Sequence, residues 1–239
     1  MGGLFSLFQS KPDGEIRRPT FQSIKETAQR ELGLDTSLYN FGISGHTKTG
    51  KSSLINAILN ENAAATGVFE TTHKMTKYAV PSLPNVCVWD IPGSGTDSHK
   101  AENYFEEKKL YVFDCLIILT QDCLTEEEIK FAREAISYGQ PVLFARSRCD
   151  ATLENMVAMD EIDEADQDAA DSFVQDMYLK FSQGLHNTGH KSLENIKVFF
   201  ISASVLRKIM KNAKTKYHFQ EREFINELKV ASASSRGKV

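Results

Sequence analysis

The fold of this chain is decided by one stretch of its sequence, Gly45-His46-Thr47-Lys48-Thr49-Gly50-Lys51-Ser52, which completes the pattern G-x-x-x-x-G-K-S. Apolar residues 40–44 precede this stretch and predict a strand, while residues 53–58 have the apolar spacing of a helix. In that setting the glycines let the backbone curl, so that successive amide hydrogens point at phosphate oxygens. The stretch therefore predicts a phosphate-binding loop at the N-terminus of a helix.

The side chains of this loop have separate expected roles. Lys51 places a positive charge on the β and γ phosphates and is a candidate catalytic residue, and the Ser52 hydroxyl is a candidate Mg²⁺ ligand. Lys48 adds a second cation, either as a surface lysine or as a further phosphate contact, and the pattern does not decide between the two. We expect nucleotide contacts from Gly45, His46, Thr47, Lys48, Thr49, Gly50, Lys51, Ser52 and Ser53.

A second motif follows the apolar run 86–90, where Asp90 and then Gly93 complete the pattern D-x-x-G. It lies about 40 residues beyond the loop, a spacing that suits two neighbouring strands. We expect Asp90 to hold Mg²⁺, usually through water, and the Gly93 amide to contact the γ phosphate, which adds Gly93 to the catalytic candidates. A carboxylate that only starts a turn is the alternative for Asp90.

Between these motifs, residues 66–73 contain the adjacent threonines Thr71 and Thr72. A loop threonine at this point can coordinate Mg²⁺ and contact the γ phosphate, closing only when triphosphate is bound. The spacing does not select one of the two, and a threonine in an edge strand is a third interpretation.

A third motif indicates which purine base the nucleotide carries. Asp150 follows a buried-strand pattern over 141–146 and can accept two hydrogen bonds from guanine, whereas adenine offers no such donor pair. The usual guanine motif has a lysine two residues before the aspartate; here Arg148 stands there, a planar cation that can stack on the purine. Ser202-Ala203 follows another apolar run and can offer a backbone amide to guanine O6. The alternative for Asp150 is a residue that merely ends a strand.

Short apolar runs alternate with segments of helical periodicity, which predicts an α/β fold. The expected fold class is a P-loop NTPase with a Ras-like G domain: a mainly parallel sheet with helices on both faces. A stretch ending at Pro81 reads as an antiparallel edge strand. The expected strands are 39–44, 86–90, 115–120, 142–146 and 198–202, with the edge strand at 77–80 and helices at 20–32, 52–60, 126–138 and 219–230.

The domain organisation follows from the same patterns. Residues 1–19 read as a flexible arm, 20–35 as an N-terminal helix capped by Thr20 and stopped by Gly33, 36–231 as the G domain, and 232–239 as a disordered tail. Nine acidic residues and no Lys or Arg stand between Glu154 and Asp176. We interpret this segment as solvated helix faces, with a partner-docking surface as the alternative.

Composition excludes several functions. A net charge of −4 argues against general nucleic-acid binding. No apolar run reaches the roughly 18–20 residues of a membrane-spanning helix, and the N-terminus lacks a secretory signal. The four cysteines form no C-x-x-C pair, which argues against a metal centre or a disulfide framework and suits a reducing cytosol; Cys87 and Cys115 read as buried side chains.

The combined motifs resemble the immunity-related GTPases, the interferon-inducible p47-type family, over about residues 20–230. The resemblance rests on Thr66-Gly67-Val68, Tyr78, Pro84-Asn85-Val86, Trp89-Asp90-Ile91-Pro92-Gly93, Tyr104-Phe105, Tyr111, residues 114–119 and Met1-Gly2-Gly3-Leu4-Phe5-Ser6. It implies GTP hydrolysis with Mg²⁺ as cofactor, Thr72 as the switch threonine, homodimerisation through G domains and a role in defence. Family members carry a large helical domain, whereas only a short helix and about ten further residues flank the G domain here.

Hydrolysis also needs a placed water, and Ras-like proteins position it with a glutamine just after D-x-x-G. Here Gly93 is followed by Ser94, Gly95 and Thr96. We therefore expect slow intrinsic turnover, accelerated when two G domains dimerise across bound nucleotide, as the family resemblance implies.

The pattern Met1-Gly2-x-x-x-Ser6 matches an N-myristoylation signal at Gly2. We expect a cytoplasmic protein that associates peripherally with a membrane through this chain and adjacent apolar and basic residues. A guanine-nucleotide-binding regulatory or scaffold protein with negligible hydrolysis is the alternative function, favoured by the absent glutamine and helical domain. An ATP-using P-loop kinase is a third reading, and Asp150 argues against it.

Overall fold

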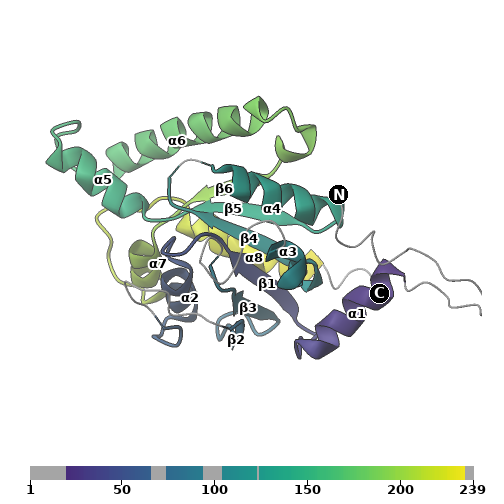
Figure 1. Ribbon diagram of the computed structural model, residues 1–239. Helices are drawn as coiled ribbons and strands as arrows, with labels where there is room; N and C mark the ends of the chain where they lie inside the picture. The colour runs from purple at the N-terminus through teal and green to yellow at the C-terminus, as the bar shows by residue number, and fades with distance from the viewer. Residues whose placement is uncertain (1–19, 66–73, 94–103, 123, 235–239) are drawn as a thin grey trace, which may run out of the picture.

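A six-stranded sheet forms the centre of the protein, with helices packed on both faces (Figure 1). The computed structural model describes residues 20–65, 74–93, 104–122 and 124–234. Within them the strand order is β2-β3-β1-β4-β5-β6. The strands are β1 (Tyr39–Ser44), β2 (Thr76–Ala79), β3 (Val86–Asp90), β4 (Cys115–Thr120), β5 (Val142–Arg146) and β6 (Lys197–Phe200).

Neighbouring strands are parallel except at the edge, where β2 pairs antiparallel with β3. The predicted fold class and the predicted edge strand are therefore confirmed. β3 lies on one side of β1 and β4 on the other, so the direction of the chain connections reverses at β1. In open α/β sheets, ligands bind outside the carboxyl ends of the strands at such a point.

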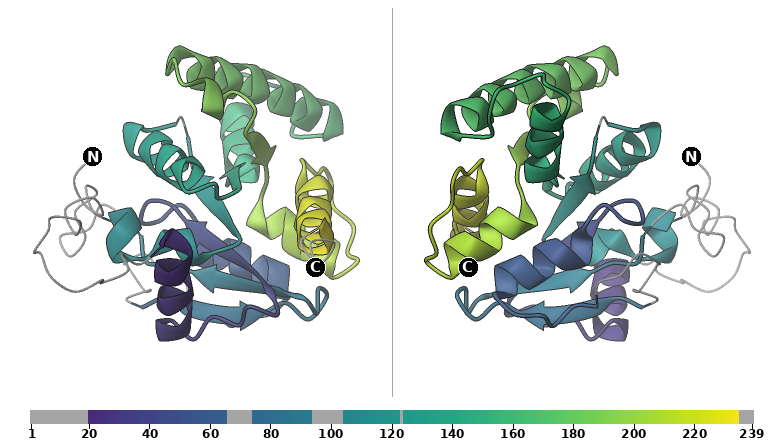
Figure 2. Two further views of the ribbon diagram at one scale, coloured as in Figure 1. Left: turned by 90° about the vertical axis from the view of Figure 1, so that its right-hand side faces the viewer. Right: turned by 90° about the vertical axis from the view of Figure 1, so that its left-hand side faces the viewer.

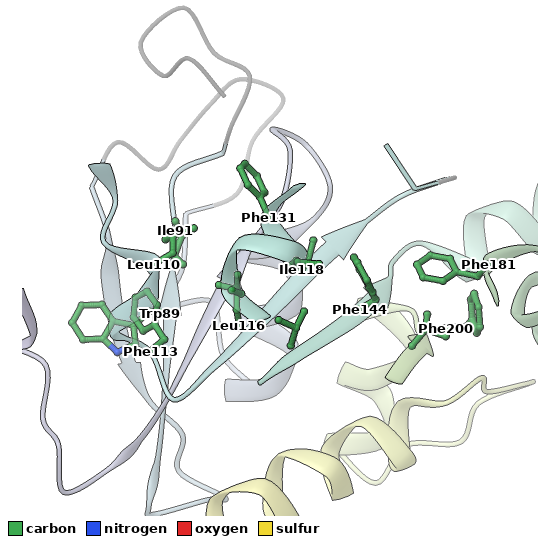
Figure 3. Close-up of a cluster of buried hydrophobic side chains, with 14 of the residues drawn as sticks. Trp89, Ile91, Leu110, Phe113, Leu116, Ile118, Phe131, Phe144, Phe181 and Phe200 are labelled. Carbon is green, nitrogen blue, oxygen red and sulfur yellow. The ribbon is translucent and has the colours of Figure 1, made fainter. Parts of the chain in front are cut away.

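Successive side chains along each strand face opposite ways, and each face of the sheet buries its own hydrophobic cluster. On one face, fully or nearly fully buried aromatic and aliphatic side chains run from Trp89 to Phe200 (Figure 3). The opposite face carries Ile43, Val88, Ile117, Leu143 and Phe199. Cys87 and Cys115 are buried, one on each face, as the sequence predicted.

Helices from both halves of the chain cover these clusters. The first cluster takes buried side chains from α1 (Phe21–Glu31), α3 (Tyr104–Glu107), α4 (Glu126–Ser137), α5 (Cys149–Ala158) and α6 (Gln167–Asn187). The second takes them from α2 (Lys51–Leu59), α7 (Ala203–Met210) and α8 (Glu221–Ser234). The 3₁₀ helices η2 (Leu110–Val112) and η3 (Lys191–Leu193) complete the described elements. Figures 1 and 2 show α6 lying across the β6 end of the sheet.

Local signals set the helix ends. Thr20 Oγ1 accepts a hydrogen bond from Ser23 N (3.2 Å), so α1 begins at Phe21 as its capping residue predicts. Gly33, with φ +64°, follows its end. Asp166 caps α6 by accepting from Ala169 N (2.9 Å). The other acidic residues between Glu154 and Asp176 are solvent-exposed, in agreement with the prediction of solvated faces.

Three predicted boundaries were wrong by two or more residues; one is the start of the last helix, which was predicted at Phe219 and lies at Glu221. β6 ends at Phe200 instead of residue 202, because Ser202 turns the chain and caps α7 by accepting from Val205 N. The last helix runs from Glu221 to Ser234, so residues 232–234 of the predicted disordered tail are helical. Small residues such as Ala231 and Ser232 lack a strong stop signal, and the helix continues. Among the helices of the described segments, none combines the length and the apolar character needed to span a lipid bilayer.

Candidate nucleotide-binding site

The predicted site residues gather at one edge of the sheet, where the parallel strands end. β1 leads into the phosphate loop, β3 into the D-x-x-G motif, and β5 and β6 into the two segments predicted to bind the base. In the sheet register Asp90, the last residue of β3, pairs with Ile43, next to the last residue of β1, while β4 continues two residues beyond the partner of Ser44. The parallel sheet thus brings together motifs that are far apart in the sequence.

The phosphate loop packs against the central strand β4 at its first residue. Gly45 has φ +142°, and a Cβ added there would lie 2.3 Å from Leu119 O. Thr49 Oγ1 donates to His46 O (2.9 Å) and closes the loop from within. Gly50 then precedes α2, whose N-terminal amides face the loop. The backbone is therefore curled as an anion-binding loop requires.

Lys51 lies inside this loop with 7% of its surface exposed. Its Nζ donates to Gly45 O (3.0 Å) and to His46 O (2.8 Å). These bonds keep the ammonium group at the centre of the loop, beside the positive end of α2. The arrangement concentrates positive charge where the sequence predicts the β and γ phosphates.

The two predicted Mg²⁺ ligands of the described segments are in direct contact. Ser52 Oγ donates to Asp90 Oδ2 over 2.8 Å, although the residues belong to α2 and β3. Asp90 is 1% exposed, so its carboxylate is held by the surrounding chain. A hydroxyl and a carboxylate are the hard oxygen donors that Mg²⁺ prefers, and this donor set fits the ion.

Gly93 touches the phosphate loop directly. A Cβ at this position would lie 2.5 Å from Thr47 Oγ1 and 2.8 Å from Thr47 N, so only glycine fits without a shift of the loop. Thr47 Oγ1 is buried there and has no hydrogen-bond partner among the residues that the structure describes. The contact places the Gly93 amide next to the loop, as its predicted role at the γ phosphate requires.

Two long-range hydrogen bonds join the predicted base-binding segment after β5 to the phosphate loop. Arg148 Nη2 donates to Lys48 O (2.8 Å), and Ser147 Oγ donates to Thr49 O (2.6 Å). Ser147 is 5% exposed and also donates to Thr120 O (3.2 Å). The guanidinium predicted to lie over the purine is thus fixed against the phosphate loop, and the two segments form one unit.

Asp150 is oriented by two serines. It lies in the first turn of α5, and its Oδ2 accepts from Ser204 Oγ (2.6 Å). Ser204 Oγ is in turn 3.0 Å from Ser202 Oγ. Asp150, Ser202 and Ala203 therefore converge, as expected of one pocket for the base edge. Burial raises the pKa of the neighbouring Cys149 thiol to about 12, so this thiol stays protonated and packs as a small apolar group.

The remaining residues predicted to contact the nucleotide lie farther from the centre of the phosphate loop or outside the described residues. His46 turns its side chain toward α4, with Nε2 3.1 Å from Glu127 Oε2, which leaves only its backbone in the loop. Ser53 is exposed in the first turn of α2, and Ala203 is the first residue of α7. Thr71, Thr72, Gly2 and residues 94–96 lie outside the described residues. The switch threonine and the lipid anchor at Gly2 therefore stay predictions.

Lys48 adopts the left-handed region with φ +70°, which side chains other than glycine enter at a cost of about 1 kcal/mol. Its side chain is exposed, and its carbonyl is the group that Arg148 uses. We therefore expect Lys48→Gly to raise the free energy of unfolding by about 0.5–1 kcal/mol and to leave GDP affinity within about threefold. Chemical denaturation and calorimetry measure the two quantities. A tenfold loss of affinity would instead assign the Lys48 ammonium to phosphate binding.

Sequence reasoning missed three residues of this site. Ser147 and Ser204 stand beside the predicted base-binding motifs, but a serine at these positions carries no signal of its partner. Glu221 is 0% exposed, and its Oε1 accepts from Ser202 N (2.8 Å). In the sequence it resembles any acidic residue at the start of a helix, so only the folded chain reveals its contact with the base segment.

A phosphate loop between β1 and α2, a D-x-x-G motif after β3 and two predicted base-binding segments after β5 and β6 define a G domain of the P-loop NTPase class. Residues 14–204 match the family model described as Interferon-inducible GTPase (IIGP). The chain belongs to this family, in agreement with the resemblance seen in the sequence.

Individual relatives match over part of the chain. It is 33% identical over 138 residues to mouse T-cell-specific guanine nucleotide triphosphate-binding protein 2 (Mus musculus), covering 56% of this chain and 33% of that protein. It is 31% identical over 159 residues to Interferon-inducible GTPase 5 of Rattus norvegicus, covering 62% and 34%. The chain spans about a third of the length of these curated relatives.

The matches among solved structures are more distant in sequence. NFeoB from S. thermophilus has a TM-score of 0.47 and 17% identity, covering 74% of this chain and 61% of that one. The elongation factor SelB from Methanococcus maripaludis has a TM-score of 0.48 and 14% identity, covering 81% and 34%.

Proposed function

We propose that this chain binds guanine nucleotides and hydrolyses GTP to GDP and phosphate. One observation carries the proposal: the segment that holds Asp150 is hydrogen-bonded to the phosphate loop through Arg148 and Lys48 O (2.8 Å). A single nucleotide can therefore place its phosphates beside Lys51 and its purine beside Asp150. Membership of a family named for GTP hydrolysis supports the same conclusion.

Recognition of the phosphates rests on backbone amides and one lysine. The amides of the loop and of the first turn of α2 can donate to phosphate oxygens, and the dipole of α2 favours the negative charge. Lys51 Nζ, which lies among the loop carbonyls, can exchange these acceptors for the β and γ oxygens, where it stabilises the charge that develops during transfer.

Ser52 and Asp90 would hold Mg²⁺, with Thr72 as a further ligand according to the family resemblance. The bound ion neutralises charge on the β and γ phosphate oxygens. The Gly93 amide, packed on Thr47, can donate to a γ-phosphate oxygen and so distinguish triphosphate from diphosphate. These groups supply charge neutralisation but not the placement of the attacking water.

We also propose that a second copy of the chain completes the hydrolytic site. The sequence places no glutamine directly after Gly93, so water positioning is the missing component. Dimerisation of G domains across bound nucleotide, which the family resemblance implies, would supply it. The single chain then turns over slowly.

Phosphate release tests this function. With saturating GTP and Mg²⁺, we expect the rate per chain to rise at least about tenfold as protein concentration increases, because a group supplied by a partner completes the transition state. A fast rate that does not depend on concentration would contradict the dimer. Single-turnover release that is absent at every concentration, with GTP bound, would favour the nucleotide-binding scaffold.

A further inference from the structure

Glu221, the first residue of α8, is a fully buried carboxylate that the hydrolytic mechanism does not use. Its Oε1 accepts from Ser202 N (2.8 Å) and its Oε2 accepts from Phe219 N (2.7 Å). Ser202 directly precedes Ala203, whose amide is predicted to meet guanine O6. One side chain therefore joins the base-binding segment after β6 to the segment that begins α8.

Burial of this carboxylate is costly. Desolvation raises the pKa of Glu221, and the bonds from the Ser202 and Phe219 amides lower it again. Charge-assisted bonds of this kind are about twice as strong as neutral ones, and they offset the loss of water. An apolar side chain of similar size would fill the same space without this cost, so bulk packing does not account for the residue.

The adjacent residue makes the link rigid. Gln220 Oε1 accepts from Phe200 N (2.9 Å), and Gln220 N donates to Phe200 O (3.0 Å). Gln220 thus pairs with the exposed edge of β6 at the last residue of the strand. Together, Gln220 and Glu221 fix the backbone on both sides of Ile201, immediately before the base pocket.

The link continues to the residue that selects the base. Ser202 Oγ lies 3.0 Å from Ser204 Oγ, which donates to Asp150 Oδ2 (2.6 Å). A shift of Ser202 would therefore displace both the amide that follows it and the hydroxyl that orients Asp150. The contacts run without a gap from α8 through Glu221 and two serines to Asp150.

We propose that Glu221 is a positioning residue for guanine, which holds Ser202 so that the Ala203 amide and Asp150 meet the base, and which couples the seating of α8 to nucleotide affinity. This inference rests on guanine binding as proposed above. Because the coupling is reciprocal, bound nucleotide also stabilises the first turn of α8.

Glu221→Gln tests the proposal with little change in shape. The carboxylate accepts hydrogen bonds from two backbone N–H groups, whereas the glutamine amide has one oxygen acceptor and one NH₂ donor. One of the two backbone N–H groups therefore faces a donor, and its hydrogen bond is lost. We expect GDP affinity to fall about 10- to 100-fold, the effect of one charge-assisted bond. Affinity for inorganic pyrophosphate, which does not reach the base segment, should stay within about twofold. Calorimetry with each ligand gives the ratio.

Asp114→Asn is the matched control. The Asp114 carboxylate accepts from Asn40 N (2.8 Å) near the amino ends of β1 and β4, at the opposite end of the strands from the site, so the same change lowers stability without moving the base segment. We expect this variant to keep the wild-type ratio of GDP to pyrophosphate affinity. If Glu221→Gln also keeps that ratio, or lowers both affinities equally, Glu221 is only structural and the proposal is overturned.

Hydrogen exchange on the wild-type chain keeps the test decisive if the variant does not fold. GDP should slow exchange of the Ser202 and Phe219 amides, which donate hydrogen bonds to Glu221. Pyrophosphate should leave the exchange rates of these amides nearly unchanged. Equal protection by the two ligands, or none by GDP, would overturn the coupling. If the wild-type chain binds no GDP at all, the proposed function itself fails, and this result is distinct from the others.

Discussion

Gly45→Ala is expected to lower GDP affinity by up to about 100-fold. The added Cβ would lie 2.3 Å from Leu119 O, an atom of the central strand β4 that cannot move aside, and the backbone has φ +142°. Strain of this kind amounts to about 3 kcal/mol at most, which corresponds to roughly a 100-fold change in a binding constant. The phosphate loop relieves the strain by moving, and its amides then no longer converge.

Calorimetry with GDP and Mg²⁺ measures this effect, and Gly139→Ala is its control. Gly139 also has a positive φ, +67°, but a Cβ there would meet no atom within 4 Å. The control should cost about 1 kcal/mol of stability and leave GDP affinity unchanged. Wild-type GDP affinity in the Gly45→Ala variant would contradict the assignment of this segment as the phosphate loop. Equal losses of GDP affinity in both variants would show that global stability is responsible.

Asp150→Asn is expected to exchange guanine for xanthine as the preferred base. The carboxylate accepts from the guanine N1–H and from the amine; the amide loses one of these bonds and the charge that strengthens the other, so GDP affinity should fall about 100- to 1,000-fold. Xanthine carries an oxygen in place of the amine, and the new amide can donate to it. Ser204 can both donate and accept, so its contact with position 150 survives the change.

Binding of GDP, xanthosine diphosphate and ADP to the variant measures the exchange. Asp176→Asn removes the same charge from an exposed position of α6 and should bind GDP like the wild-type chain. Loss of GDP binding without any gain in xanthosine diphosphate binding would show that Asp150 supports the fold of the pocket and does not select the base. ATP or ADP binding as tight as that of GDP in the wild-type chain would remove guanine selectivity altogether.

Much of this site could be predicted because its chemistry depends on residue type and order. Gly45 through Ser52 lie next to one another in the chain, and the loop geometry is local. Asp90 and Gly93 are three residues apart, after a strand whose apolar run is clear in the sequence. Parallel strands end at one edge, so the meeting of Ser52 with Asp90 follows from the fold class once the strands are recognised.

The contacts that join the motifs could not be predicted. Arg148 and Lys48 are 100 residues apart, and the choice of a backbone carbonyl as acceptor leaves no mark on the sequence at Lys48. The His46 ring pairs with Glu127 of α4, so the predicted nucleotide contact of this residue falls to its backbone. Both outcomes depend on how α4 and α5 pack against the sheet, which side-chain spacing alone does not determine.

The sequence by itself therefore determined the class of fold, the phosphate loop and the candidate metal and base residues, because strand and helix periodicity and loop chemistry are properties of neighbouring residues. Only the tertiary structure decided that Ser147 and Arg148 bind the phosphate loop, that Ser204 orients Asp150, and that Glu221 is buried beneath Ser202. A hydrogen bond to a backbone atom does not depend on the identity of the residue that supplies that atom, and the contact of Ser204 with Asp150 joins side chains 54 residues apart. Such contacts arise only when packing brings distant segments to within about 3 Å.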